Sequence, residues 1–167
     1  DADGGTLTYD WDLNNDNNFE TPGQSATFSA AGLDGPTSRT IQVRVTDGGG
    51  LSSVSQATVN VQNVAPVVNI NPAGPVALNA PVSVSGSFTD AGTPDTHTAV
   101  IDWGDGTTSP GTVTEAGGSG TVTGSHTYSA AGSYTVKLTV TDDDGAPASA
   151  TTTINVGYGV VALYDQT

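Results

Sequence analysis

One segment of this chain occurs twice, one hundred positions apart. Residues 25–32 read Ser-Ala-Thr-Phe-Ser-Ala-Ala-Gly, and residues 125–132 read Ser-His-Thr-Tyr-Ser-Ala-Ala-Gly. Shorter landmarks recur in the same order at offsets of 92 to 95. Trp11 matches Trp103, residues 45–47 match residues 140–142, and residues 59–61 match residues 154–156. Several matched landmarks in one order indicate a single module present twice. Their offsets drift where insertions are tolerated, in loops.

Within each copy, apolar residues alternate with polar ones. Ile41, Val43 and Val45 form one such run. The same spacing recurs in residues 134–140, and no window shows sustained helical periodicity. Alternation of this kind predicts half-buried strands, and many short strands separated by Gly- and Asp-rich turns predict an all-β fold of tandem Ig-like β-sandwiches. Further strands are expected over residues 25–32, 54–61, 67–70, 82–88 and 151–156. Trp11 and Trp103 are expected to be equivalent core anchors, because Trp has the largest apolar area.

The boundary between the copies is predicted at residues 63–66, Asn-Val-Ala-Pro, because proline interrupts a central strand and stiffens a short connection. This divides the chain into an incomplete sandwich (1–63), a complete one (64–156) and a tail (157–167). By this alignment, the first copy lacks strands matching residues 67–70 and 82–88.

Two explanations of the chain ends remain open. The abrupt start at Asp1 indicates a fragment whose tail is a linker. Alternatively, the tail is a strand in which Val161, Leu163 and Tyr164 contact another copy of the chain. A tail that completed the first module of the next chain would build a head-to-tail filament.

Composition excludes several functions. The chain has seventeen acidic residues and only three basic ones, which gives a net charge of −14. Nucleic acid and anionic membrane surfaces are therefore not expected partners. There is no cysteine, hence no disulfide or thiolate metal site. No run approaches the ~20 apolar residues of a membrane span, so membrane insertion is not expected. An acidic surface suits solubility, cation binding and an extracellular location.

A family resemblance rests on the second copy. Residues 102–106 read Asp-Trp-Gly-Asp-Gly, and residues 126–128 (His-Thr-Tyr), 131–136 and 138–142 follow. Across residues 66–156 this pattern resembles a PKD (polycystic kidney disease) domain. The first copy departs from it, with Trp-Asp-Leu-Asn-Asn-Asp from Trp11 and Phe28 in place of Tyr128, and resembles a variant of bacterial surface proteins. The resemblance implies non-catalytic, extracellular, Ig-like modules in tandem arrays, which act as spacers or contact proteins and carbohydrates.

Calcium is the one cofactor that the residues suggest. Oxygen-bearing side chains alternate in the loop after Trp11, and closely spaced Asp and Asn supply the hard ligands that Ca²⁺ takes. These residues are Asp12, Asn14, Asp16, Asn18 and Glu20. The loop lacks the sixth-position Gly and distal Glu of an EF-hand. The alternative is that these residues only form turns. In the second copy, weaker candidates are Asp90, Asp95, Asp105 and Asp142, of which Asp105 is also a turn former.

No catalytic constellation is evident. His126 lies in a repeated segment and is expected to be structural, while His97 is expected in a loop without a partner. We therefore predict a non-catalytic structural or adhesion module of a bacterial surface or secreted protein, with other protein chains, including its own copies, as partners. The alternative is a carbohydrate- or protein-binding accessory module of a secreted hydrolase. Glycan binding would need exposed aromatic side chains, for which Tyr9, Tyr158 and Tyr164 are the candidates.

Overall fold

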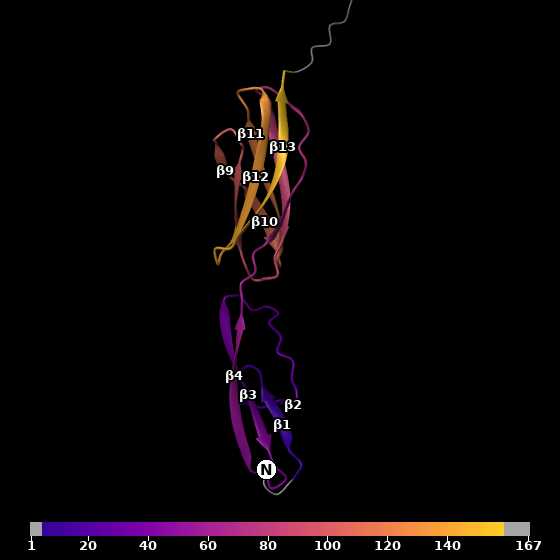
Figure 1. Cartoon of the computed structure of the whole chain (residues 1–167), viewed down its shortest axis with the longest axis vertical. Coiled ribbons are helices and arrows are strands. Elements are labelled where there is room, and N and C mark those ends of the chain that lie inside the picture. The colour runs from indigo at the N-terminus through magenta and orange to yellow at the C-terminus, as the bar shows by residue number, and fades with distance from the viewer. Residues whose placement is uncertain (1–4, 159–167) are drawn as a thin grey trace, which may run out of the picture. The chain divides into compact units, whose positions relative to one another are not determined.

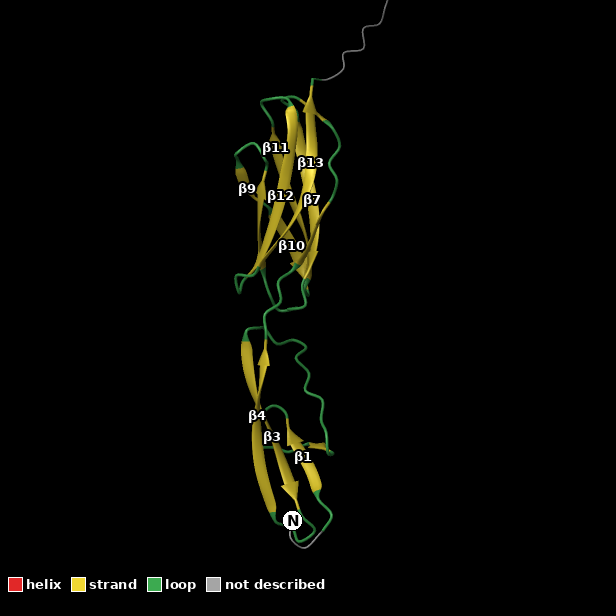
Figure 2. Ribbon diagram, viewed as in Figure 1, coloured by secondary structure: helices red, strands yellow, loops and turns green. Residues whose placement is uncertain are grey.

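The computed structural model describes residues 5–158, and this part of the chain consists of strands joined by turns and loops (Figure 2). It divides into two compact units at the bond between Asn63 and Val64. No helix in the described range is long and apolar enough to cross a membrane. The all-β prediction is confirmed.

Unit 1, which ends at Asn63, contains one antiparallel sheet in the described residues, with strand order β2-β1-β3-β4 (Figure 1). The long hairpin β3–β4 pairs Val45 with Ser53 and Thr37 with Val61. Its turn is held by the Asp47 carboxylate, whose Oδ1 accepts the N–H groups of Gly49 and Leu51, both at 2.9 Å. The strands of unit 1 are β1 (Thr8–Asp12), β2 (Thr21–Pro22), β3 (Thr37–Thr46) and β4 (Ser52–Val61).

Unit 2, which begins at Val64, is a two-sheet sandwich of the immunoglobulin-like kind. One sheet has the order β10-β11-β7-β5, and the other has the order β6-β13-β12-β8-β9. The strands are β5 (Val67–Ile70), β6 (Val76–Ala77), β7 (Pro81–Thr89), β8 (His97–Asp102), β9 (Thr108–Pro110), β10 (Thr112–Ala116), β11 (Ser119–Thr127), β12 (Gly132–Asp142) and β13 (Pro147–Gly157).

The core of unit 2 forms because strands from both sheets alternate in burial. Along β7 every second residue is buried, and Val136, Leu138 and Val140 of β12 are at most 1% exposed. The two layers approach closely at Gly86, where a Cβ atom would lie 2.5 Å from Leu138 Cδ2, so a larger residue would force the sheets apart. Trp103, Tyr128 and Phe88 are the largest buried side chains.

Two sequence expectations about the repeat are wrong. Residues 25–32 form a loop and not a strand. The two tryptophans are also not equivalent, because Trp11 pairs with Val43 inside the sheet, whereas Ile101 pairs with Leu138, the counterpart of Val43. In strand register Trp11 therefore corresponds to Ile101, and Leu13 corresponds to Trp103. Only Trp103 is a buried anchor, at 1% exposure, while Trp11 is half-buried.

Candidate metal sites

The loop after β1 is organised around the carboxylate of Asp12, which is completely buried. Its Oδ1 accepts backbone N–H groups from Asn14, Asn15 and Asp16 at 3.2, 2.6 and 3.3 Å, and its Oδ2 accepts the N–H of Asn17 at 2.8 Å. The chain can wrap around one carboxylate because Asn15 and Asn17 adopt positive φ values of 62° and 67°, which asparagine tolerates. Four donors on one side chain fix the loop.

Gln42 on β3 closes this loop against the sheet. Its Nε2 donates to Asn15 Oδ1 at 2.8 Å and lies 3.5 Å from Asp12 Oδ2, and its Oε1 accepts a bond from Gln56 at 3.3 Å. Asp12 and Gln42 are both buried, whereas none of the hydrophobic side chains described in unit 1 is buried. The best-buried side chains described in unit 1 are thus polar.

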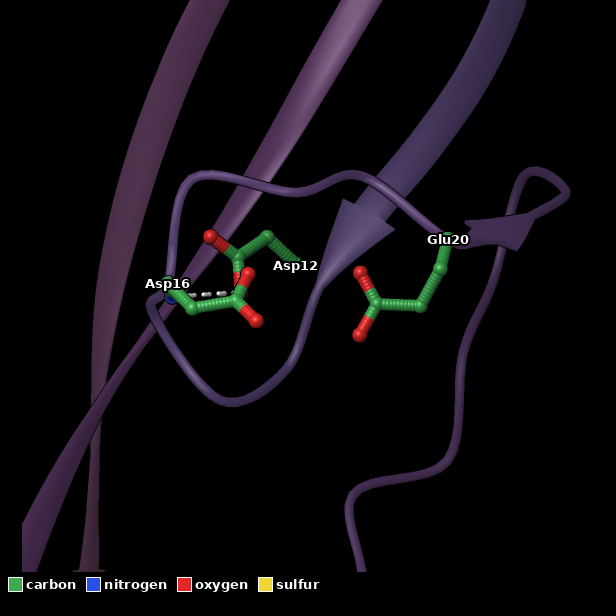
Figure 3. A group of neighbouring side chains, drawn as sticks. All are labelled: Asp12, Asp16 and Glu20. Carbon is green, nitrogen blue, oxygen red and sulfur yellow. Dashed lines mark hydrogen bonds between the residues drawn. The ribbon is translucent and has the colours of Figure 1, made fainter.

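Three carboxylates meet at the rim of this loop. Asp12, Asp16 and Glu20 each offer an oxygen, and these oxygens lie within 4.8 Å of one another (Figure 3). Like charges at this separation repel, and a divalent cation between them would convert the repulsion into attraction. Carboxylate oxygens at such spacing are ligands that Ca²⁺ accepts, with water completing its shell of six to eight. The arrangement therefore fits a hard divalent cation.

The two asparagines of the predicted ligand set both form hydrogen bonds with Asp16. The side chain of Asn14 exchanges two hydrogen bonds with Asp16, from Nδ2 to Asp16 Oδ2 and from the Asp16 N–H to Asn14 Oδ1, both at 3.1 Å. Asn18 donates its backbone N–H to Asp16 Oδ1 at 2.8 Å. The structure thus brings together the three acidic members of the predicted set, while the Asn14 side chain and the Asn18 backbone N–H orient Asp16.

A second acidic cluster lies at one end of the unit 2 sandwich. Asp90 follows β7, Asp95 lies in the loop before β8, and Asp142 ends β12; their carboxylate oxygens lie within 4.8 Å of one another. All three residues are buried. Asp90 Oδ1 accepts the N–H of Gly92 at 2.8 Å, and Asp142 Oδ1 accepts that of Ala146 at 2.7 Å. This cluster combines three of the weaker calcium candidates.

His97 adjoins this cluster, contrary to its expected place in a loop without a partner. It begins β8 with a side chain that is 0% exposed; Nε2 lies 3.2 Å from Asp90 Oδ2, and Nδ1 lies 2.7 Å from Glu115 Oε2. Burial by itself lowers the pKa of His97, but hydrogen bonds and charge attraction from Asp90 and Glu115 outweigh it, so the pKa is raised. Glu115 lies on β10, and its meeting with His97 depends on sheet packing that leaves no pattern in the sequence.

The fourth weaker candidate, Asp105, lies elsewhere and belongs to no cluster of three potential metal-ligating acids or histidines among residues 5–158. Its Oδ1 accepts bonds from Thr107, and its Oδ2 lies 2.7 Å from His126 Nε2. The Thr107 bond and the His126 contact lower the pKa of Asp105 to about 2, against a smaller opposing effect of burial. His126 stacks on Trp103 with ring centroids 4.9 Å apart. These contacts give Asp105 and His126 a structural role in the turn.

The remaining candidates concern partner binding. Val161, Leu163 and Tyr164, expected to form a donated strand, lie outside the described residues. Tyr164, which is also a candidate for glycan stacking, therefore stays a prediction for both roles. Of the other aromatic candidates, Tyr9 is half-buried in β1, and Tyr158 is 80% exposed.

The fold and strand order of unit 2 define an immunoglobulin-like sandwich. Comparison with family models matches residues 63–156 to the PKD domain, and the chain belongs to this family. The prediction of a PKD domain is therefore confirmed for the second copy, while membership of the first copy stays a prediction.

Solved structures with some similarity include the PKD1 domain of Epp from Vibrio anguillarum. It is 33% identical, and the match covers 59% of this chain and 100% of that one, with a TM-score of 0.45. Domains 4 and 5 of the S-layer protein SbsC are 18% identical over 72% of this chain and 58% of theirs (TM-score 0.37). Cadherin domains 3–6 of protocadherin gamma B2 are 14% identical over 93% of this chain and 40% of theirs (TM-score 0.43).

Proposed function

We propose that this chain is a non-catalytic structural or adhesion module of an extracellular or surface protein, and that Ca²⁺ bound by its acidic loops stiffens it. Membership of the PKD family supports the module role. The observation that supports calcium is the convergence of Asp12, Asp16 and Glu20 within 4.8 Å. A loop that is already organised by Asp12 loses little conformational entropy when it binds a cation.

Calorimetric melting with and without Ca²⁺ tests this proposal. At a calcium concentration ten times Kd, linkage predicts that the unit 1 transition rises by roughly 5 °C or more, and EDTA reverses it. The double variant Asp16→Asn, Glu20→Gln removes two ligands and should abolish this rise. Asp47→Asn is the matched control, because it removes an acid from a turn of the same unit and should keep the rise. A melting profile indifferent to both Ca²⁺ and EDTA contradicts the calcium proposal.

A finer part of the proposal is that chains join head to tail, with the tail of one chain adding a strand to unit 1 of the next. The support is the unpaired outer edge of β4 within the described residues. Deletion of residues 158–167 should abolish fibres seen by negative-stain microscopy. Unchanged fibres, or a monodisperse monomer from the intact chain, would contradict strand donation by the tail.

Carbohydrate binding, as an accessory module of a secreted hydrolase, is the second candidate. Its support is Tyr158, whose ring is exposed beyond the end of β13 and could stack on a sugar. Tyr158→Ala should then remove binding on a glycan array, and an array on which the intact chain shows no signal would reject this candidate.

A further inference from the structure

Four aromatic rings lie in contact with one another in unit 2. The indole of Trp103 stacks on the imidazole of His126, with ring centroids 4.9 Å apart. His126 meets Tyr128 in a T-shaped contact at 4.6 Å, and Tyr128 stacks on Tyr134 at 4.2 Å with ring planes 19° apart. The rings therefore form a continuous series from Trp103 to Tyr134, here called the aromatic column.

The aromatic column joins the two sheets of the sandwich. Trp103 follows β8 and Tyr134 lies on β12, which pair in one sheet, whereas His126 lies on β11 of the other sheet. Tyr128 follows β11, and its hydroxyl donates to the carbonyl oxygen of Trp103 at 2.9 Å. Sheet packing and this hydrogen bond hold the rings, so their contacts are a fixed part of the fold.

The two ends of the aromatic column differ in their access to water. Trp103 and Tyr128 are each 1% exposed, whereas Tyr134 is half-buried, and its hydroxyl donates to the carbonyl oxygen of Ala130 at an exposed position, at 2.9 Å. Burial, together with the charge of Asp105 and the neighbouring Tyr134, raises the pKa of Tyr128 to about 12, so Tyr128 keeps its proton. Tyr134 is thus the phenol of the column that can release a proton to water.

The composition makes the aromatic residues the main targets of oxidation. The chain contains no cysteine and no methionine, the side chains on which oxidants commonly act. Oxidation of Trp103 would place polar products in a closed apolar core, where they are costly. At neutral pH, oxidation of a tyrosine that loses its proton needs a lower potential than oxidation of a tryptophan to its radical cation. Electron transfer from Tyr134 to oxidised Trp103 is therefore favourable.

We propose that the aromatic column carries an electron from Tyr134 to oxidised Trp103, and so moves oxidative damage from the core to the surface. Near-ultraviolet light removes one electron from the Trp103 indole, and dissolved dioxygen takes it up to become superoxide. The Tyr134 phenol then gives one electron to the Trp103 radical cation and its proton to water. Trp103 is restored, Tyr134 becomes a neutral tyrosyl radical, and the intervening rings of His126 and Tyr128 are unchanged.

This redox role goes beyond the proposed structural or adhesion function. It uses none of the acidic loops, and it does not depend on an association between chains. Failure of the experiment below therefore leaves the calcium and strand-donation proposals standing, and their failure leaves the redox role standing.

The test irradiates the intact chain with near-ultraviolet light in aerated buffer and measures oxidised tryptophan by peptide mass spectrometry. Tyr134→Phe keeps the ring but removes the phenol that supplies the electron and the proton, so the yield of oxidised Trp103 should rise several-fold. Trp11 lies in unit 1 and belongs to no ring contact of the aromatic column, so its oxidised yield should stay unchanged and serves as the internal reference.

Tyr158→Phe is the matched control variant. It removes a phenol that is 80% exposed and lies outside the aromatic column, and it should leave the oxidation of Trp103 unchanged.

Flash photolysis gives a second measurement that leaves Tyr134 in place. In the variant Trp11→Phe, Trp103 is the sole tryptophan. The absorption of its radical should decay as the absorption of a tyrosyl radical grows at the same rate.

Three results would overturn the proposal. The first is equal oxidation of Trp103 in the intact chain and in Tyr134→Phe, which would show that burial alone protects the indole. The second is an equal rise in Tyr158→Phe, which would show that any surface phenol serves. The third is decay of the Trp103 radical without growth of a tyrosyl radical.

Discussion

The two units contain the same hairpin in the same register, yet they bury it differently. In unit 2 Leu138 is 1% exposed beneath a second sheet, while in unit 1 its counterpart Val43 is half-buried on a single sheet. Unit 1 instead buries Asp12 and Gln42 under a polar loop. Alternating apolar residues give a sheet one apolar face, but this face is buried only where a second layer packs on it.

The largest expected effect is a loss of unfolding free energy, and it compares Leu138 with its counterpart Val43. Leu138→Ala should destabilise unit 2 by about 2–5 kcal/mol, because it opens a cavity in a closed core. Val43→Ala removes fewer methyl groups from a half-buried site and should cost unit 1 about 1 kcal/mol or less. Urea unfolding followed by hydrogen exchange in each unit measures both values. Equal losses would show that the face of the sheet that carries Val43 is covered in solution.

A smaller effect is expected at the buried acid of unit 1. Asp12→Ala should destabilise unit 1 by roughly 2 kcal/mol, because it leaves four backbone N–H groups without their acceptor. Asp102 occupies the equivalent register position, but among residues 5–158 its carboxylate accepts a single backbone N–H group, that of Gly104 at 2.9 Å. Asp102→Ala should therefore cost less than about 1 kcal/mol. Hydrogen exchange measures the loosening of the loop, and equal exchange rates of the amides of residues 12–20 in both variants would contradict the larger effect expected for Asp12→Ala.

The smallest expected effect is a dependence of melting temperature on pH, which distinguishes unit 2 from unit 1. Both histidines lie in unit 2, where His97 contacts Asp90 and Glu115 and pairs across the strands with Asp142. Because its pKa is raised in the folded state, the stabilisation is complete below the unfolded value of 6.5 and is lost as pH rises through the folded pKa. The melting temperature of unit 2 should fall over this range, and His97→Gln should remove that fall.

His126→Gln is the control for the pH experiment, because His126 contacts a different acid, Asp105. This variant should keep the fall in melting temperature that His97 causes. If the melting temperature still falls with pH in His97→Gln but no longer falls in His126→Gln, the effect belongs to His126 and the prediction is wrong.

The fold class and several strand positions were predictable from local pattern. Residues 67–70 form β5 as predicted, and the expected run at 82–88 lies within β7. These predictions succeed because side chains alternate across a strand, so one face of each strand can be identified from the sequence. The acidic cluster after Trp11 was found for a similar local reason, since its members are close in the chain.

The sequence by itself determined the all-β class, many of the strand positions and which loop gathers acids, because these depend on neighbours along the chain. Only the tertiary structure decided that Trp11 corresponds to Ile101 and that residues 25–32 remain a loop. It also decided that His97 meets Glu115, and that Val43 lacks the cover that Leu138 has. These outcomes depend on strand pairing and sheet packing between distant segments, which no local pattern encodes.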